Sequence, residues 1–203
     1  MNETTKQPVH SEGPQSAPGR LRQPRIRLGA VIALAVAAGV IAWIAVGKDD
    51  SSTSPKGPTS VTRSSSIGPA AYSPQGLRAL SAKLNHPIYW AATKKGYTYE
   101  VTRTADGKIY VRYLPPGVKV GAKGSSYLII ATYPYRHAYQ ALKAVQDGRG
   151  HRIRGGGLAV VQDGYPQSVH VAFANKNYQV EVYDPSPKTS LAVALSGVVR
   201  PVS

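Results

Sequence analysis

The chain contains no cysteine, and this absence excludes several classes of protein. A domain that folds outside the cell without cysteine has no disulfide bonds, so burial of its core must supply its stability. A lipid anchor attached through a cysteine is excluded as well, and so is any metal site with thiolate ligands.

Acidic residues are also scarce: 10 Asp and Glu stand against 25 Lys and Arg, and the formal net charge is +15. Residues 70–203 hold 17 of the basic and six of the acidic side chains, a net charge of +11. A folded domain this basic attracts polyanions in a salt-dependent manner. The alternative interpretation is that the charge only keeps the domain soluble.

One long stretch, Leu28–Gly47, has no charged residue, and Trp43 is its only side chain with a polar tip. As a helix it would be about 30 Å long, which matches the hydrocarbon thickness of a bilayer. Four arginines between residues 20 and 27 precede it, which predicts a cytoplasmic N-terminus and an external C-terminal part. A cleaved signal peptide ending at Ala45 or Gly47 is the rival interpretation, but the apolar stretch is long for one.

The sequence therefore predicts four regions. Residues 1–27 form a disordered basic cytoplasmic tail, and residues 28–47 form the transmembrane helix. Residues 48–69, rich in Ser, Thr, Pro and Gly, form a flexible linker. Residues 70–203 form one extracytoplasmic domain, which is long enough to bury a core of its own.

Within the domain, apolar periodicity predicts helices and strands in the order αββββαβββα. Ser73-Pro74 and Ser186-Pro187 are helix-start signals, because a serine caps free amides and a proline fits the first helical position. A further helix is expected from Pro134 to Asp147. The strands are expected at residues 88–91, 97–104, 108–114, 127–133, 158–161, 168–173 and 178–183. Helices segregated against a largely antiparallel sheet define an α+β fold.

The sequence predicts the strand register of the first hairpin. A three-residue loop, Ala105–Gly107, with its glycine in the left-handed conformation, places Val101 opposite Val111. The same register places Glu100 opposite Arg112 on the outer face of the sheet. Both faces are then chemically consistent, whereas a two-residue loop sets Val101 against Arg112.

A second hairpin pairs His170 with Glu181, and this is the only histidine–carboxylate pair that the registers predict. Such a pair can orient a general base, but no motif places a serine beside it, and a surface pair across the strands is the simpler interpretation. The other histidines, His86, His137 and His151, show no metal-ligand spacing. We therefore expect no catalytic residue, no metal and no cofactor.

The segment between residues 149 and 157 is the best candidate for an anion site. Its glycines let backbone amides approach an anion, and its cationic side chains supply charge and hydrogen-bond donors. It lacks the ending of a phosphate-binding loop, and a plain flexible connector is the alternative. The candidate residues are Arg149, His151, Arg152 and Arg154, and Lys94, Lys95, Lys119 and Lys123 in other loops extend a basic face.

Three segments carry a family resemblance: Tyr110–Gly117, Gly156–Val160 and Val180–Pro187. With them the chain resembles, from roughly Leu77 to Val199, a family of uncharacterised membrane-associated proteins of high-GC Gram-positive bacteria. That family has lipoprotein-like and single-pass members, and a chain without cysteine is similar to the latter. A looser likeness is to the outer domains of membrane-bound anti-sigma factors, although the tail here is too short to hold a sigma factor. Neither resemblance implies an activity for any residue.

Together these features predict a single-pass plasma-membrane protein, not an enzyme, with an external binding or adaptor domain. Its expected partner is an anionic envelope polymer, a lipid head group or an envelope protein, and no specific nucleic acid is expected. Two alternatives are an envelope hydrolase acting on sugar or phosphate esters and a structural scaffold of an envelope complex.

Overall fold

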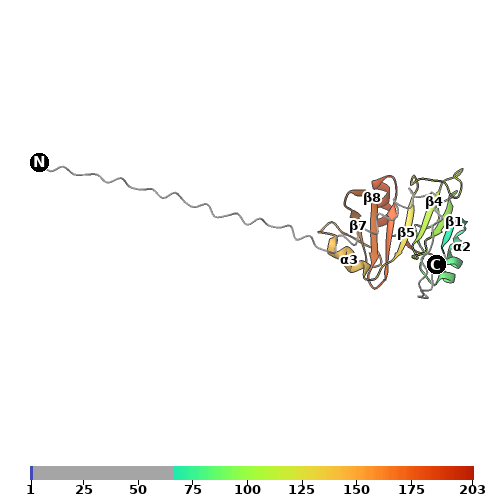
Figure 1. Ribbon diagram of the computed structural model, residues 1–203, viewed down its shortest axis with the longest axis horizontal. Helices are drawn as coiled ribbons and strands as arrows, with labels where there is room; N and C mark the ends of the chain where they lie inside the picture. The colour runs from blue at the N-terminus through green and yellow to red at the C-terminus, as the bar shows by residue number, and fades with distance from the viewer. Residues whose placement is uncertain (2–65) are drawn as a thin grey trace, which may run out of the picture.

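The computed structural model describes Met1 and residues 66–203, and an eight-stranded antiparallel sheet is the centre of this part of the chain (Figure 1). The strand order is β1-β3-β4-β5-β9-β8-β7-β6. In that order the strands run over Ile67–Tyr72, Thr98–Arg103, Ile109–Leu114, Ile129–Pro134, Tyr178–Tyr183, Tyr165–Phe173, Gly157–Gln162 and His151–Ile153.

Three helices and a small second sheet cover the large sheet. Helices α2 (Pro74–Leu84) and α4 (Pro187–Leu195) pack on one side, together with a two-stranded sheet of β2 (Tyr89–Trp90) and β10 (Arg200–Pro201). We call this side the first face. Helix α3 (Ala138–Val145) packs over β7 and β8 on the opposite side, the second face. Figure 1 shows α3 beside β7 and β8, and α2 at the β1 end of the sheet. The α+β class, the antiparallel sheet and the three helices are thus confirmed.

Both helix-start signals act as predicted. The Ser73 hydroxyl accepts a hydrogen bond from the Gly76 amide at 3.0 Å, and Pro74 occupies the first turn of α2. The Ser186 hydroxyl accepts one from the Thr189 amide at 3.4 Å at the start of α4. Each serine thereby satisfies an amide that has no partner within its helix.

The start of α3 was predicted wrongly. Pro134 is the last residue of β5, opposite Tyr178 of β9, and the helix begins only at Ala138. The Tyr135 amide donates to the Asn177 carbonyl oxygen at 2.9 Å, so Pro134 lies at a position of the β5–β9 ladder that requires no amide donor. A proline fits such a position as well as a helix start, and the residue type alone does not decide between them.

Three strands were not predicted. Strand β1 begins at Ile67, inside the segment expected to be linker, and a shift of register between Ile67 and Ala70 hides its alternation. Strand β6 lies within the candidate anion-site segment, residues 149–157, and β10 pairs with β2, which therefore leaves the main sheet. The expected transmembrane helix, residues 28–47, lies outside the described residues. Among residues 66–203, no helix is both long and apolar enough to span a bilayer.

The predicted registers of both hairpins are confirmed. Val101 lies opposite Val111 and Glu100 opposite Arg112, and Gly107 has a φ of 86°, in the left-handed region. Because side chains alternate along a strand, this register places the valines on the first face. There they join the largest apolar cluster of the described chain, together with α2 and α4.

Glu100 and Arg112 lie on the second face, but they are buried rather than on an exposed outer face. Their side chains are 0% and 4% exposed, and Arg112 Nη1 lies 2.7 Å from Glu100 Oε1. The loop after β4 covers them: Arg112 Nη2 donates to the carbonyl oxygens of Ala122 and Gly124 at 2.8 and 3.1 Å. The Gly121 amide donates to Glu100 Oε2 at 2.5 Å. The ion pair therefore fixes loop 115–127 to the sheet.

Removing one partner of this pair should destabilise the domain far more than removing both. Arg112→Met leaves a buried carboxylate, and Glu100→Leu leaves a buried guanidinium, so each should cost about 3–5 kcal/mol. The double variant E100L/R112M leaves no buried charge and should lie closer to the parent chain than either single variant. Urea unfolding of the full chain in neutral detergent measures all four free energies. If the loss of unfolding free energy in the double variant equalled the sum of the two single losses, the predicted coupling between Glu100 and Arg112 would be contradicted.

Candidate functional site

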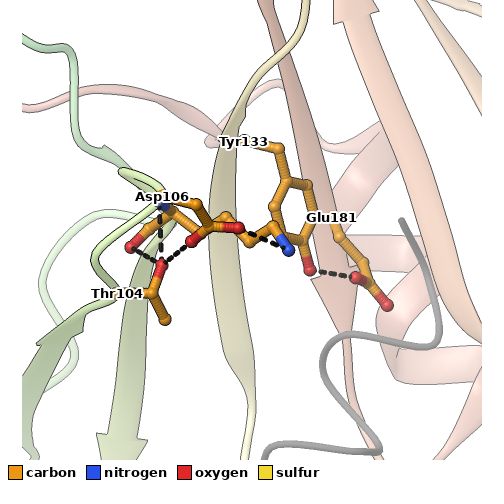
Figure 2. A network of polar contacts seen from close by, with 5 residues as sticks. Thr104, Asp106, Tyr133 and Glu181 are labelled. Carbon is orange, nitrogen blue, oxygen red and sulfur yellow. Dashed lines mark hydrogen bonds and ion pairs between the residues drawn. The ribbon is translucent and has the colours of Figure 1, made fainter. Parts of the chain in front are cut away.

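A cluster of buried polar side chains occupies the second face where β5, β9 and β8 lie side by side. Glu181 is at its centre and is 1% exposed. The Tyr133 hydroxyl donates to Glu181 Oε2 at 2.5 Å, and the Ser168 hydroxyl donates to Oε1 at 2.6 Å. Figure 2 shows the Tyr133 side chain pointing at the Glu181 carboxyl group. Each carboxyl oxygen thus has a donor from a neighbouring strand.

The low polarity of this site shifts the pKa of its acids. Burial raises the pKa of Glu181 above its ordinary value, although its bonds to Ser168 and Tyr133 partly oppose the shift. Burial and the nearby Glu181 carboxyl raise the pKa of Tyr133 and of Tyr110, and these two tyrosines also hydrogen-bond to each other. Both tyrosines are therefore fixed in their protonated, donor form.

His170 is the second titratable group of the cluster and has both ring nitrogens occupied. Gln179 Nε2 lies 2.7 Å from Nδ1, and Gln162 Oε1 lies 3.0 Å from Nε2. An amide nitrogen donates and an amide oxygen accepts, so the ring is neutral with its proton on Nε2. Burial lowers the pKa of His170 to about 4, which agrees with a neutral ring.

His170 and Glu181 are opposite each other across β8 and β9, as the register predicts. They are buried rather than a surface pair, however, and each side chain bonds to other residues: Glu181 to Ser168 and Tyr133, His170 to the two glutamines. Ser168, whose position no motif revealed, donates to the carboxyl group and not to the imidazole. These hydrogen bonds join four strands, β5, β9, β8 and β7, and they leave His170 no free nitrogen for proton transfer.

The four candidate anion-site residues are not brought to one surface. Arg149 forms an exposed two-pronged ion pair with Asp163, at 2.6 and 3.0 Å. His151 and Arg152 are consecutive in the edge strand β6, so their side chains point to opposite faces. The Arg154 side chain lies against Gly197 beyond α4, where an added Cβ would meet its Cδ at 3.3 Å. The segment thus includes the edge strand β6, which pairs with β7.

A surface hollow of about 400 Å³ lies beside the end of α2, and its described lining includes Arg78, Asn85, His86 and Ser203. His86 Nδ1 lies 2.9 Å from the carbonyl oxygen of Pro87, so Nδ1 carries the ring proton and donates. Burial lowers the pKa of His86, and its Nε2 has no hydrogen-bond partner. Arg78 Nη1 donates to the carbonyl oxygen of Ser203 at 3.0 Å, which occupies part of its binding capacity.

No group of three or more metal-ligating side chains is brought together within residues 66–203. Comparison of the chain with protein-family models, with curated proteins and with solved structures finds no significant match.

The neutral state of His170 should make the domain acid-sensitive. Below a pH of about 6.5 the unfolded chain binds a proton at this histidine, whereas the folded chain does not until the pH approaches 4. Stability should therefore fall as the pH is lowered through this interval, by up to about 3 kcal/mol. Urea unfolding at several pH values, with the His170→Gln variant alongside, measures the difference. A difference in unfolding free energy that does not change between pH 6.5 and pH 4 would contradict this assignment.

Proposed function

We propose that this chain is a single-pass plasma-membrane protein that displays a basic α+β domain outside the cell and binds an anionic polymer of the envelope. The N-terminal residues 1–27 are cytoplasmic, and residues 28–47 cross the membrane. The domain acts by binding and not by catalysis. The observation that carries the proposal is the charge of the folded surface.

The surface carries many unpaired cations, because most acids of the domain are buried or already paired. Of the six acidic side chains between residues 66 and 203, Glu100 and Glu181 are buried. Asp106 and Asp163 form exposed ion pairs with neighbouring basic residues. The exposed cations outside these pairs are Arg78, Lys83, Lys94, Lys95, Lys119, Lys123, Arg136, Lys143, Arg152, Arg154, Lys176, Lys188 and Arg200.

Such a surface favours a polyanionic partner over a small neutral one. A surface with many positive charges raises the local concentration of a polyanion and speeds its association, and this attraction weakens as the salt concentration rises. A hydrolase would need a nucleophile or a base that meets its substrate, whereas the histidine–carboxylate cluster of this domain is almost fully buried. The buried cluster and the cationic exterior together support a binding role.

The polymer-binding proposal predicts salt-sensitive retention. The full chain in neutral detergent should bind immobilised linear polyphosphate at low ionic strength and elute as the salt concentration rises, because each lysine–phosphate contact releases counterions. Neutral dextran on the same support serves as the control matrix. Retention that is equal on both matrices, or that does not change with salt, would contradict the proposal.

The proposed topology predicts the result of surface proteolysis. Protease added to intact cells should digest the domain, whereas a tag placed before residue 28 should survive until the cells are broken, because the basic flank is retained in the cytoplasm. Immunoblots against the domain and against the tag give both readings. A domain that is protected in intact cells would overturn the orientation.

A further inference from the structure

We propose that one end of the main sheet is the polymer-binding surface, and that four lysines there contact the phosphate groups of a flexible anionic polymer. This lysine end consists of Lys94 and Lys95 in loop 91–97, before β3, and of Lys119 and Lys123 in loop 115–127, after β4. The inference rests on the proposed function and assigns the binding surface that the function requires.

Both loops leave the sheet at the same place. Thr98 begins β3 and lies opposite Leu114, which ends β4, so the segments before and after this strand pair share one end of the sheet. The loops also contact each other: an added Cβ on Gly96 would lie 3.5 Å from Cγ of Pro116. All four lysines are exposed.

Loop 91–97 is held from the first face of the sheet. The Tyr99 hydroxyl accepts from the Lys94 amide at 2.7 Å and lies 3.2 Å from the Lys94 carbonyl oxygen. The Tyr113 hydroxyl accepts from the Ala91 amide at 2.6 Å. The main chain that carries Lys94 and Lys95 is therefore fixed.

Loop 115–127 is held from the second face. Glu100 accepts from the Gly121 amide, two residues after Lys119. Arg112 donates to the carbonyl oxygens of Ala122 and Gly124, the two neighbours of Lys123. Tyr99 and Glu100 are consecutive residues, as are Arg112 and Tyr113. Side chains of the β3–β4 pair thus hold both loops: those on the first face hold loop 91–97, and those on the second face hold loop 115–127.

No acid lies within the two loops that carry the lysines. Between residues 88 and 127 the only acids are Glu100 and Asp106. Glu100 is fully buried and paired, and Asp106 lies in the turn at the other end of the hairpin, bonded to Lys108. Asp184, half-buried after Tyr183 at the same end of the sheet, accepts a hydrogen bond from the Ser186 amide at 2.9 Å. The two loops themselves therefore present four lysines and no acid.

The lysine end lies at the opposite end of the sheet from the point where the chain enters it. Ile67 of β1 lies opposite Arg103, and Tyr72 lies opposite Tyr99, so the chain enters the sheet at the end away from the lysines. Strand β1 alone separates the two ends by about 20 Å. The entry of the chain therefore leaves the lysine end open to a polymer of the envelope.

Lysine suits such a polymer chemically. Its ammonium group is a compact charge with rotatable donors, which accepts phosphates in many orientations, whereas arginine favours fixed two-pronged contacts. Two pairs of lysines on neighbouring loops can contact successive groups of a flexible chain. The opposite end of the sheet presents Arg136, Lys176 and Arg154 singly on separate turns, together with the Asp106–Lys108 pair.

The test compares two variants of the full chain that have the same net charge. The first carries K94Q, K95Q, K119Q and K123Q. The matched control carries K83Q, R136Q, K143Q and K176Q, which remove four exposed cations elsewhere. Binding to linear polyphosphate and to phosphatidylglycerol vesicles is measured in a salt series, with unfolding curves to verify that both variants are folded.

We expect the lysine-end variant to lose about tenfold or more of its polyphosphate affinity and to show a shallower salt dependence, because fewer counterions are released. The control variant should stay within about twofold of the parent chain. Equal losses in both variants would overturn the lysine end as the site while leaving the proposed function intact. A parent chain that binds no polyphosphate would overturn the proposed function itself. A lysine-end effect seen only with phosphatidylglycerol vesicles would overturn the polymer in favour of lipid.

Discussion

The buried ion pair between Glu100 and Arg112 is the interaction on which the proposed binding surface of this domain depends. An ion pair that is 0% and 4% exposed contributes little net stability, because desolvation of the charges offsets their attraction. Its effect is instead positional. Both partners also bond to the main chain of loop 115–127, so a loop with three left-handed glycines, Gly117, Gly121 and Gly124, has one defined place against the sheet. Two of the four lysines of the proposed surface are carried by that loop.

The two faces of the sheet are stabilised by different interactions. The first face is an apolar core in which valines of β3, β4, β8 and β9 pack against α2 and α4. The second face buries Glu100, Arg112, Ser168, His170, Gln179 and Glu181. Buried polar groups need partners, and here most are supplied by residues of neighbouring strands. Such a network fixes strand register as well as contributing stability, because a slip of one residue would leave several charged or polar groups unpaired.

The sequence was sufficient for the parts of the fold that depend on local signals. Serine–proline pairs marked two helix starts, and a glycine after Asp106 set the register of the first hairpin, which in turn paired Glu100 with Arg112 correctly. The burial of that pair could not be predicted, because it depends on loop 115–127 folding back over the sheet, and no periodicity encodes such a contact. The same applies to His170 and Glu181: alternation indicated their shared face but not that this face is covered.

The candidate anion site was harder to judge from sequence. Arg149, His151, Arg152 and Arg154 are close along the chain, but strand alternation and the Asp163 ion pair direct them to different places. Lys94 and Lys119 are far apart in sequence and reach one end of the sheet only because β3 and β4 pair. A basic segment is visible in sequence, whereas a basic surface made by two loops depends on the strand register between them.

Amide hydrogen exchange across loop 115–127 tests most directly whether the ion pair positions this loop. Exchange and polyphosphate affinity are both measured in the parent chain and in the Arg112→Met variant. The account predicts that the Gly121 amide is protected in the parent chain and that residues 119–124 lose protection in the variant, while β3 and β4 stay protected. Polyphosphate affinity should fall in the same variant although all four lysines remain. Unchanged protection of the loop, or loss of protection with full affinity, would contradict the account.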